Sequence, residues 1–221
     1  MSIDKRLSQI ILIVLVGLII MTLSACSLTK GSRAWIEKNC VVDIYKVYPT
    51  KNPKDLFKVF PDGFDITQVY TNPDGVMYQL ELEGEPKTKT IKGQFVINPY
   101  SDNKAQKLSE VVVENNQVVF SNEADKKEWP IKGFLFQHLT INQKKIDGLK
   151  ERKHSYNSNS GIFHISYKLT DSRVNKLLKK ENKQITDFEI TGSGKNYYGR
   201  TIVFRFSDHS EFSEMINRPY N

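Results

Sequence analysis

Met-Tyr-Gln-Leu-Glu-Leu-Glu, residues 77–83, is the stretch that decides the fold, because its side chains alternate in character along the chain. Its even-numbered positions hold tyrosine and two leucines, whereas the odd positions after Met77 hold glutamine and two glutamates. A period of two places successive side chains on opposite faces of a β-strand, so the stretch predicts a half-buried strand. The turn signature Asn72-Pro73-Asp74-Gly75 directly precedes it.

Similar signals occur further along the chain. Residues 88–98 alternate less regularly, and two valine-rich runs flank Asn115-Asn116 in the manner of a hairpin. Residues 162–169 alternate cleanly, with phenylalanine, isoleucine, tyrosine and leucine on one face. Further strands are predicted at residues 185–191, 201–206 and 211–216. Because strands follow strands without long helices between them, we predict an α+β fold with an antiparallel sheet.

A few helices are expected to pack on this sheet. The first, an N-terminal helix over about residues 34–47, has apolar side chains near helical spacing. Cys40 belongs to it and is interpreted as a core thiol; the alternative is a reactive cysteine, although no activating base lies nearby in sequence. Asp171 caps a basic amphipathic helix near residues 171–183. Residues 134–141 fit a strand or a buried helix, and residues 142–152 fit a short helix.

The first 26 residues carry an export signal. Lys5 and Arg6 precede an apolar run over residues 10–23, which has the length of a secretory signal and is shorter than an ordinary membrane-spanning helix. The run ends in Leu23-Ser24-Ala25-Cys26, in which the small residues suit cleavage between Ala25 and Cys26. The Cys26 thiol can then accept a diacylglyceryl group. This pattern is similar to the lipobox of bacterial lipoproteins.

Cleavage would leave a mature chain of 196 residues (221 − 25) that begins with a diacylglyceryl, N-acylated Cys26. Two or more acyl chains attach a protein stably to a membrane, at about 0.8 kcal/mol per buried CH₂ group. The expected organisation is a signal peptide over residues 1–25, a tether over 26–32 and a single α+β domain over 33–221. The protein is therefore expected at the cell membrane, lipid-anchored and facing the exterior. The alternative is an uncleaved single-pass signal anchor.

The composition is that of a folded basic domain. Aromatic residues make up 11% of the chain, and the formal net charge is +7, which falls to +6 when Asp4, Lys5 and Arg6 leave with the signal peptide. A basic surface attracts acidic lipid, phosphate-rich polymers or nucleic acid. Export argues against nucleic acid as a partner. The remaining alternatives are a specific acidic ligand and simple electrostatic compatibility with a negatively charged envelope.

No sequence pattern points to catalysis, a metal or a cofactor. Gly192-Ser193-Gly194-Lys195 lacks the spacing of a phosphate-binding loop and fits a turn between strands. Asp208-His209-Ser210 has the residue types of a catalytic triad, but sequence neighbours do not face one another as a triad requires, so we predict a hairpin turn. The four histidines, at positions 138, 154, 164 and 209, lack zinc-site spacing.

Two basic clusters are the candidate sites for an anionic polymer or headgroup. The first lies beside the loop that follows Tyr156, and the second lies on the predicted helix after Asp171. Their members are Lys150, Arg152, Lys153 and His154 in the first cluster and Lys176, Lys179, Lys180 and Lys183 in the second.

The order of several signals resembles the staphylococcal tandem lipoproteins. The matching pieces are residues 48–57, 75–82 and 129–132, the Tyr156-Asn157 loop before residues 167–170, and Thr191-Gly192-Ser193-Gly194 before an aromatic strand. The stretch between Asn98 and Tyr156 is shorter than is typical of that family. The resemblance implies an uncharacterised surface lipoprotein, encoded in paralogous arrays and recognised as an antigen, with some members linked to host-cell entry. It implies no catalytic residues.

Three hypotheses follow. The first is a non-enzymatic surface lipoprotein that contacts a host-cell or envelope partner. The second is a lipoprotein that binds an anionic polymer or a small ligand through the two basic clusters. The third, an enzyme, would require a site assembled from scattered carboxylates.

Overall fold

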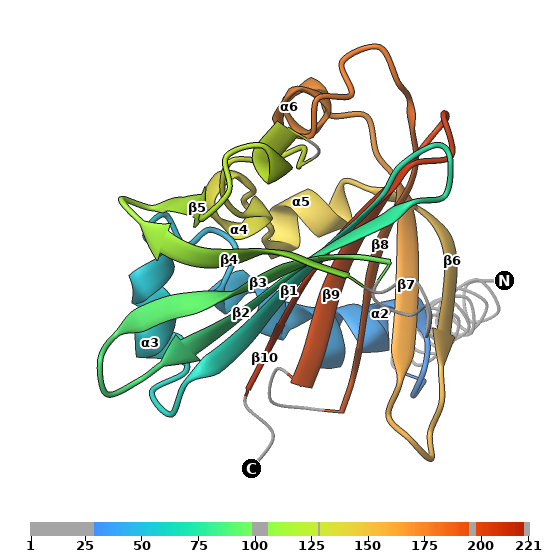
Figure 1. The fold of residues 1–221 in the computed structure, drawn as a ribbon. Helices are drawn as coiled ribbons and strands as arrows, with labels where there is room; N and C mark the ends of the chain where they lie inside the picture. Colours follow the sequence, from blue (N-terminus) through green and yellow to red (C-terminus); the bar gives the residue numbers. More distant parts are fainter. Residues whose placement is uncertain (1–28, 99–105, 128, 195–197, 219–221) are drawn as a thin grey trace, which may run out of the picture.

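The computed structural model describes residues 29–98, 106–127, 129–194 and 198–218 (Figure 1). The predicted signal peptide, the cleavage site at Ala25, the lipidated Cys26 and the turn predicted just after Asn98 lie outside these residues. Within the described part of the chain, no helix has the length and apolar character needed to cross a membrane.

The sheet has ten strands, and every pairing is antiparallel, as the alternating patterns predict. The strands are β1 (Phe64–Thr71), β2 (Met77–Glu85), β3 (Thr90–Ile97), β4 (Gln106–Glu114), β5 (Gln117–Phe120), β6 (Lys150–Tyr156), β7 (Phe163–Lys168), β8 (Ile185–Ser193), β9 (Tyr198–Phe206) and β10 (Glu211–Asn217). Their spatial order is β5-β4-β3-β2-β1-β10-β9-β8-β7-β6. The sheet therefore consists of two five-stranded meanders, joined where the first strand pairs with the last.

The helices are short. They are α2 (Arg33–Ile36), the π-helical turn η1 (Glu37–Val41), the 3-10 turns η2 (Val42–Lys46), η3 (Pro53–Asp55) and η4 (Asp125–Lys127), α3 (Leu56–Val59), α4 (Leu135–His138), α5 (Gln143–Asp147) and α6 (Ser172–Leu177). The first three form one continuous helical segment over residues 33–46, close to the predicted N-terminal helix. Ser32, at the end of the predicted tether, caps this segment, because its side chain accepts a hydrogen bond from the Trp35 amide.

The core lies between one face of the sheet and the helices. Phe64 and Ile66 of β1 are fully buried, and their partners across the strands continue the same apolar face. Ile36 and Ile44 of the N-terminal segment belong to the same cluster. Cys40 is also buried there, which agrees with its interpretation as a core thiol.

The sequence patterns do not predict two of the strands, β1 and β6. In β1 the buried face contains Gln68, whose polar side chain breaks the apolar alternation. β6 lies at the edge of the sheet, so five of its seven side chains are exposed and no alternation can appear. Residues 150–152, expected to end a short helix, are instead the start of this edge strand.

The basic helix expected near residues 171–183 is much shorter. Asp171 does cap it, since its side chain accepts from the Arg173 amide, but α6 ends at Leu177. Lys179 adopts a left-handed conformation with φ of 54°, which a continuing helix does not allow. The Asn175 side-chain Nδ2 then donates to the Lys180 carbonyl oxygen at 2.7 Å and holds the chain in a turn.

Candidate binding surfaces

The first basic cluster lies entirely on the exposed edge strand β6. Lys150 pairs with Lys168 of β7, and Lys153 pairs with Ser166, so both lysines lie on the sheet face opposite the core. His154 lies on the other side of the strand, where its Nδ1 is 2.6 Å from Glu151 Oε1. All four members of the cluster are exposed, as a binding role requires.

A bulge in β6 directs Arg152 toward the neighbouring strands. The register shifts between Glu151 and Lys153, which leaves Arg152 without a partner residue on β7. Its guanidinium donates to the Thr186 carbonyl oxygen of β8 at 2.6 Å and lies 3.7 Å from Asp187 Oδ1. Arg152 is therefore partly neutralised, whereas Lys150 and Lys153 have no ion-pair partner among the described residues.

The second cluster separates into two groups. Lys176 and Lys183 are exposed and line a hollow of about 480 Å³ beside α6, together with Arg173. Lys179, also exposed, donates to the Trp129 carbonyl oxygen at 3.3 Å. These three lysines are reachable from solvent, but only the first two share the hollow.

Lys180 does not belong to an exposed basic cluster. Its side chain is almost completely buried and bonds Asp208 at 3.1 Å and the Tyr70 hydroxyl at 3.2 Å. Desolvation opposes ionisation of Asp208, but the hydrogen bonds from Ser210 and Lys180 outweigh it and lower the Asp208 pKa to about 2. Lys180 is therefore not part of the exposed positive surface, because its ammonium is paired with Asp208 inside the protein.

The two sequence clusters meet at one end of the second meander. The start of β6, the end of β7 and the start of β8 lie at the same end of the sheet because the strands are antiparallel, and α6 lies there too (Figure 1). Lys183 and Ile185 line the hollow beside α6, and Thr186, the next residue, accepts from Arg152. We call the resulting surface the basic band. It consists of Lys150, Arg152, Lys168, Arg173, Lys176 and Lys183.

Lys168 and Arg173 belong to the basic band, although no sequence pattern points to them. Lys168 is the last residue of β7 and lies on its polar face. Only its pairing with Lys150 of β6 shows that it belongs to the basic band. Arg173 follows the helix cap and forms an ion pair with Asp171 at 3.2 Å. Among the described residues, Lys150, Lys168, Lys176 and Lys183 have no ion-pair partner. Glu181 also lines the hollow beside α6, but the cations outnumber the carboxylates, so the band keeps a net positive charge.

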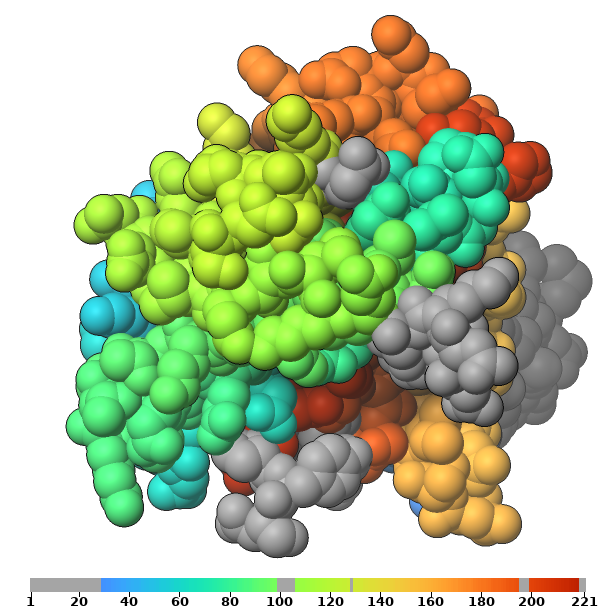
Figure 2. All heavy atoms as spheres, viewed as in Figure 1, coloured from blue at the N-terminus to red at the C-terminus, as the bar shows by residue number. Residues whose placement is uncertain are grey.

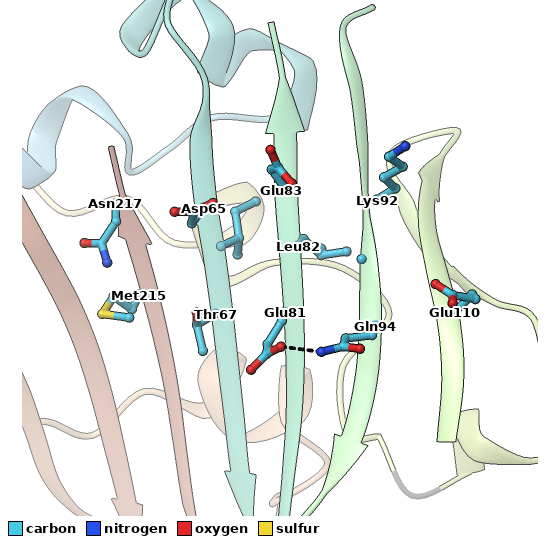
Figure 3. A pocket seen from close by; sticks show the side chains of 12 residues that line it. Asp65, Thr67, Glu81, Leu82, Glu83, Lys92, Gln94, Glu110, Met215 and Asn217 are labelled. Carbon is cyan, nitrogen blue, oxygen red and sulfur yellow. Dashed lines mark hydrogen bonds between the residues drawn. The ribbon is translucent and has the colours of Figure 1, made fainter. Parts of the chain in front are cut away.

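The first meander has the opposite charge on its solvent face. A hollow of about 630 Å³ lies over β10, β1, β2, β3 and β4 (Figure 3). The strand register arranges its side chains in two adjacent rows. The first row is Asn217, Asp65, Glu83 and Lys92, and the second is Met215, Thr67, Glu81, Gln94 and Glu110.

Like charges oppose each other in this acidic hollow. Asp65 and Glu83 are direct cross-strand partners, and Figure 3 shows the Lys92 ammonium directed away from Glu83. Burial and the Glu83 carboxylate raise the pKa of Asp65 above its usual range. Glu81, by contrast, accepts a hydrogen bond from Gln94 at 2.8 Å. No group of side chains in the described residues has an arrangement that could hold a metal ion.

The segments with catalytic residue types have structural roles. Ser193 and Gly194 present their carbonyl oxygens to the Arg200 guanidinium, at 2.8 Å and 2.9 Å, so the glycine turn binds a cation of the protein itself; Lys195 lies outside the described residues. Asp208-His209-Ser210 forms the turn between β9 and β10, as predicted. The Ser210 hydroxyl donates to Asp208 Oδ1 at 2.6 Å within this turn.

Comparison with known proteins shows the family and several structurally similar chains, one of which is a lipoprotein. The model of the Csa1 family matches residues 75–216. The lipoprotein LppX of Mycobacterium tuberculosis is 10% identical in sequence and superposes with a TM-score of 0.44. That superposition covers 76% of this chain and 92% of LppX.

Proposed function

Because the chain belongs to the Csa1 family, the staphylococcal tandem lipoproteins, we propose that it is a lipid-anchored surface protein whose domain binds a polyanionic partner. The family confirms the resemblance on which the sequence analysis relied. The remaining parts of the proposal are the anchor at Cys26, the exterior location and the binding role.

The basic band is the observation that carries this proposal. Six cationic side chains from four separate segments converge on one end of the sheet, and four of them have no ion-pair partner among the described residues. Concentrating like charge on a folded surface is destabilising because the charges repel one another, and such a surface attracts partners of opposite charge. A run of phosphate or sulfate groups would neutralise several of these cations at once.

We propose a non-enzymatic role for the same domain. The described carboxyl group with the most strongly raised pKa, Glu214, is enclosed in the core and hydrogen-bonded to the protein itself. Burial and the Glu37 carboxylate raise the pKa of the Tyr167 hydroxyl, which donates a hydrogen bond inward to Glu37. Neither group can reach an external substrate without opening the core.

Binding of the unacylated chain 26–221 to long-chain polyphosphate and to a sulfated polysaccharide tests the proposal. The triple variant Lys150→Glu, Lys176→Glu, Lys183→Glu should lower affinity at least about tenfold, since it reverses charges at the centre of the band. Raising the salt concentration from 50 to 300 mM should weaken wild-type binding strongly because salt screens exposed charges.

A matched control separates the band from overall charge. Lys51, Lys54 and Lys87 are exposed lysines outside the band, and their replacement by glutamate makes the same change in net charge. This control should alter affinity by less than about threefold. An equal loss in both triple variants, or no binding by the wild type, would show that the band is not a binding site.

A further inference from the structure

The first described residues of the chain contact Tyr156, at the end of β6 opposite the basic band, and the Arg33 side chain then extends along β6 to the Leu149 carbonyl oxygen at 3.1 Å. The Lys30 ammonium lies over the Tyr156 ring, 5.6 Å from its centroid, and the Trp35 and Tyr156 rings pack edge to face at 4.8 Å. A Cβ added at Gly31 would lie 3.4 Å from the Tyr156 Cβ, so the chain runs in direct contact with this tyrosine. Tyr156 is the last residue of β6, whereas Lys150 is the first.

The short chain between Cys26 and Thr29 determines which end of the domain faces the membrane. Cys26 is three residues before Thr29, so their Cα atoms lie within about 11 Å of each other. β6 advances about 20 Å from Lys150 to Tyr156, at roughly 3.3 Å per residue. A lipid on Cys26 therefore holds the Tyr156 end of the sheet close to the membrane and places the basic band on the far side.

The same end of the sheet carries the exposed apolar side chains. Among the described residues, the exposed large hydrophobic side chains are Val42, at 39% exposure, and Ile162, at 43%. Ile162 lies in the turn between β6 and β7, which projects from the molecule (Figure 2). Single exposed apolar residues are common on soluble proteins, so exposure alone does not indicate a membrane contact. Their position near the tether is the evidence for one.

Hydrogen bonds link the segments that bear these two side chains. The Gly194 amide donates to the Gly161 carbonyl oxygen at 3.1 Å, which ties the β6–β7 turn to the end of β8. Arg200 donates to the Gly194 carbonyl oxygen at 2.9 Å and to the Cys40 carbonyl oxygen at 3.1 Å. The helical turn of Val42 and the strand turn of Ile162 thus converge at the tether end.

We propose that this end of the domain rests on the outer leaflet of the anchoring membrane. We call it the membrane-facing end, and it consists of Lys30, Trp35, Val42, Tyr156 and Ile162. Tryptophan and tyrosine favour the headgroup region, where one part of the ring is apolar and the other is hydrated. Lys30 adds electrostatic attraction to anionic lipid headgroups. This inference rests on the Cys26 anchor of the proposed function.

The test couples the mature chain to a bilayer at its natural attachment point. The Cys26 thiol reacts with a maleimide lipid in vesicles of phosphatidylglycerol and phosphatidylcholine, while Cys40 is protected by burial. The chain has two tryptophans, and Trp129 is only 2% exposed in the core. Lipids brominated near the headgroup should therefore quench Trp35 and leave the Trp129 emission unchanged.

Variants assign the quenched signal. Trp35→Phe should abolish the quenching and needs no other change, so the result does not depend on the stability of a Trp129 variant. Ile162→Asn should reduce the quenching by about half or more, because it replaces an exposed apolar side chain with a polar one. His209→Asn, at an exposed position in the turn between β9 and β10 at the opposite end of the sheet, is the control and should leave the quenching unchanged.

The outcomes separate this inference from the proposed function. Absence of Trp35 quenching in coupled protein would overturn the orientation, even if the band variants still lose polyphosphate binding. Quenching together with unaltered polyphosphate binding by the band variants would overturn the binding role and leave the orientation intact. If both hold, coupled and free protein should bind polyphosphate with equal affinity, because the band faces away from the bilayer.

Discussion

Glu214 is a buried carboxylate that joins four segments of the chain. One oxygen accepts from the Tyr48 hydroxyl at 2.8 Å and from the Phe136 amide at 3.0 Å. The other accepts from the Gln68 side chain at 2.6 Å and from the Leu135 amide at 2.7 Å. These bonds hold the loop after the N-terminal helical segment and the start of α4 against β1 and β10.

Glu214 should make the stability of the protein pH-dependent. Burial raises its pKa from 4.5 to about 7, although its four hydrogen bonds oppose the shift. Between these two pH values the folded protein holds a proton that the unfolded chain releases, so stability should fall as pH rises from 4.5 to 7 and level off above. The fall should be up to roughly 3 kcal/mol. Urea unfolding between pH 4.5 and 8 measures it.

The variant Glu214→Gln isolates this effect. Glutamine does not titrate and offers only one acceptor oxygen, so its stability should lie below wild type at pH 5 and should lack the Glu214-dependent fall. Comparing the two proteins removes the contribution of His138, whose pKa burial lowers. Glu114→Gln, at an exposed position, should keep the wild-type pH profile. A Glu214→Gln profile parallel to wild type would contradict the assignment.

In the sequence, Glu214 interrupts the apolar face of a strand, but the pattern of that strand alone does not explain why. Phe212, Glu214 and Ile216 occupy one face of a predicted strand, so a carboxylate falls between two core positions. Gln68 is its direct partner on β1. Each polar residue looks like an interruption on its own strand, and only their pairing explains both.

At the scale of elements, Gly93 permits the close approach of β2 and β3. A Cβ at this position would lie 1.8 Å from the Glu81 carbonyl oxygen, which the backbone cannot relieve by a side-chain movement. Gly84, one row further along the same pair of strands, is covered by the Phe64 ring, 2.5 Å from where a Cβ would be. The close packing of β2 against β3 and against Phe64 therefore depends on positions without side chains.

Gly93→Ala should destabilise the domain by at least about 2 kcal/mol, because the two strands must separate to admit the methyl group. Chemical denaturation monitored by circular dichroism measures the loss. Gly148→Ala is the matched control, since Gly148 has a right-handed φ of −77° and its Cβ would make only ordinary contacts, at 3.5 Å or more. Equal stability of the two variants would mean that the sheet adapts at Gly93.

The predictability of the elements follows from their environment. The hairpin around Asn115-Asn116 is predicted from the sequence because both residues adopt positive φ, of 48° and 64°, as a tight two-residue turn requires. Residues 134–141 stay ambiguous because α4 is only four residues long. The edge strand β6 escapes prediction because solvent reaches both of its faces.

At the scale of the whole molecule, the pairing of β1 with β10 makes the two meanders one sheet. Trp129 packs against Phe95 of β3 at 5.3 Å and against Phe212 of β10 at 5.9 Å, so it contacts both halves. Trp35 instead packs against Tyr156 at the far edge. The two tryptophans thus report on different regions of one continuous core.

We expect the domain to unfold as a single cooperative unit. The variants Trp35→Phe and Trp129→Phe each leave one fluorescent reporter. In each variant the fluorescence and far-ultraviolet circular dichroism midpoints should coincide in urea, because continuous sheet pairing couples the regions. A Trp35 transition at lower urea than the dichroism transition would show that the β6 edge and the N-terminal segment unfold separately.

Charge is distributed unevenly over the solvent face of the sheet. The acidic hollow lies over the first meander, and the basic band lies at one end of the second. Between them, Arg205 binds Glu189 and Glu211, each at 2.7 Å, so the carboxylates there are neutralised within the protein. A polyanion would therefore be attracted to the band and repelled by the hollow, which favours one binding position.

The sequence by itself determined the antiparallel α+β class, the tight turns and the family, and it predicts the export signal. These properties follow from periodicity and motifs within short stretches, so no distant contact is needed to recognise them. Only the tertiary structure decided which lysines lack an ion-pair partner among the described residues. Lys180 is bound to Asp208, whereas Lys168 lies beside Lys150 on the neighbouring strand. The tertiary structure also decided that the tether and the basic band lie at opposite ends of β6, because strand pairing sets the position of segments far apart in the chain.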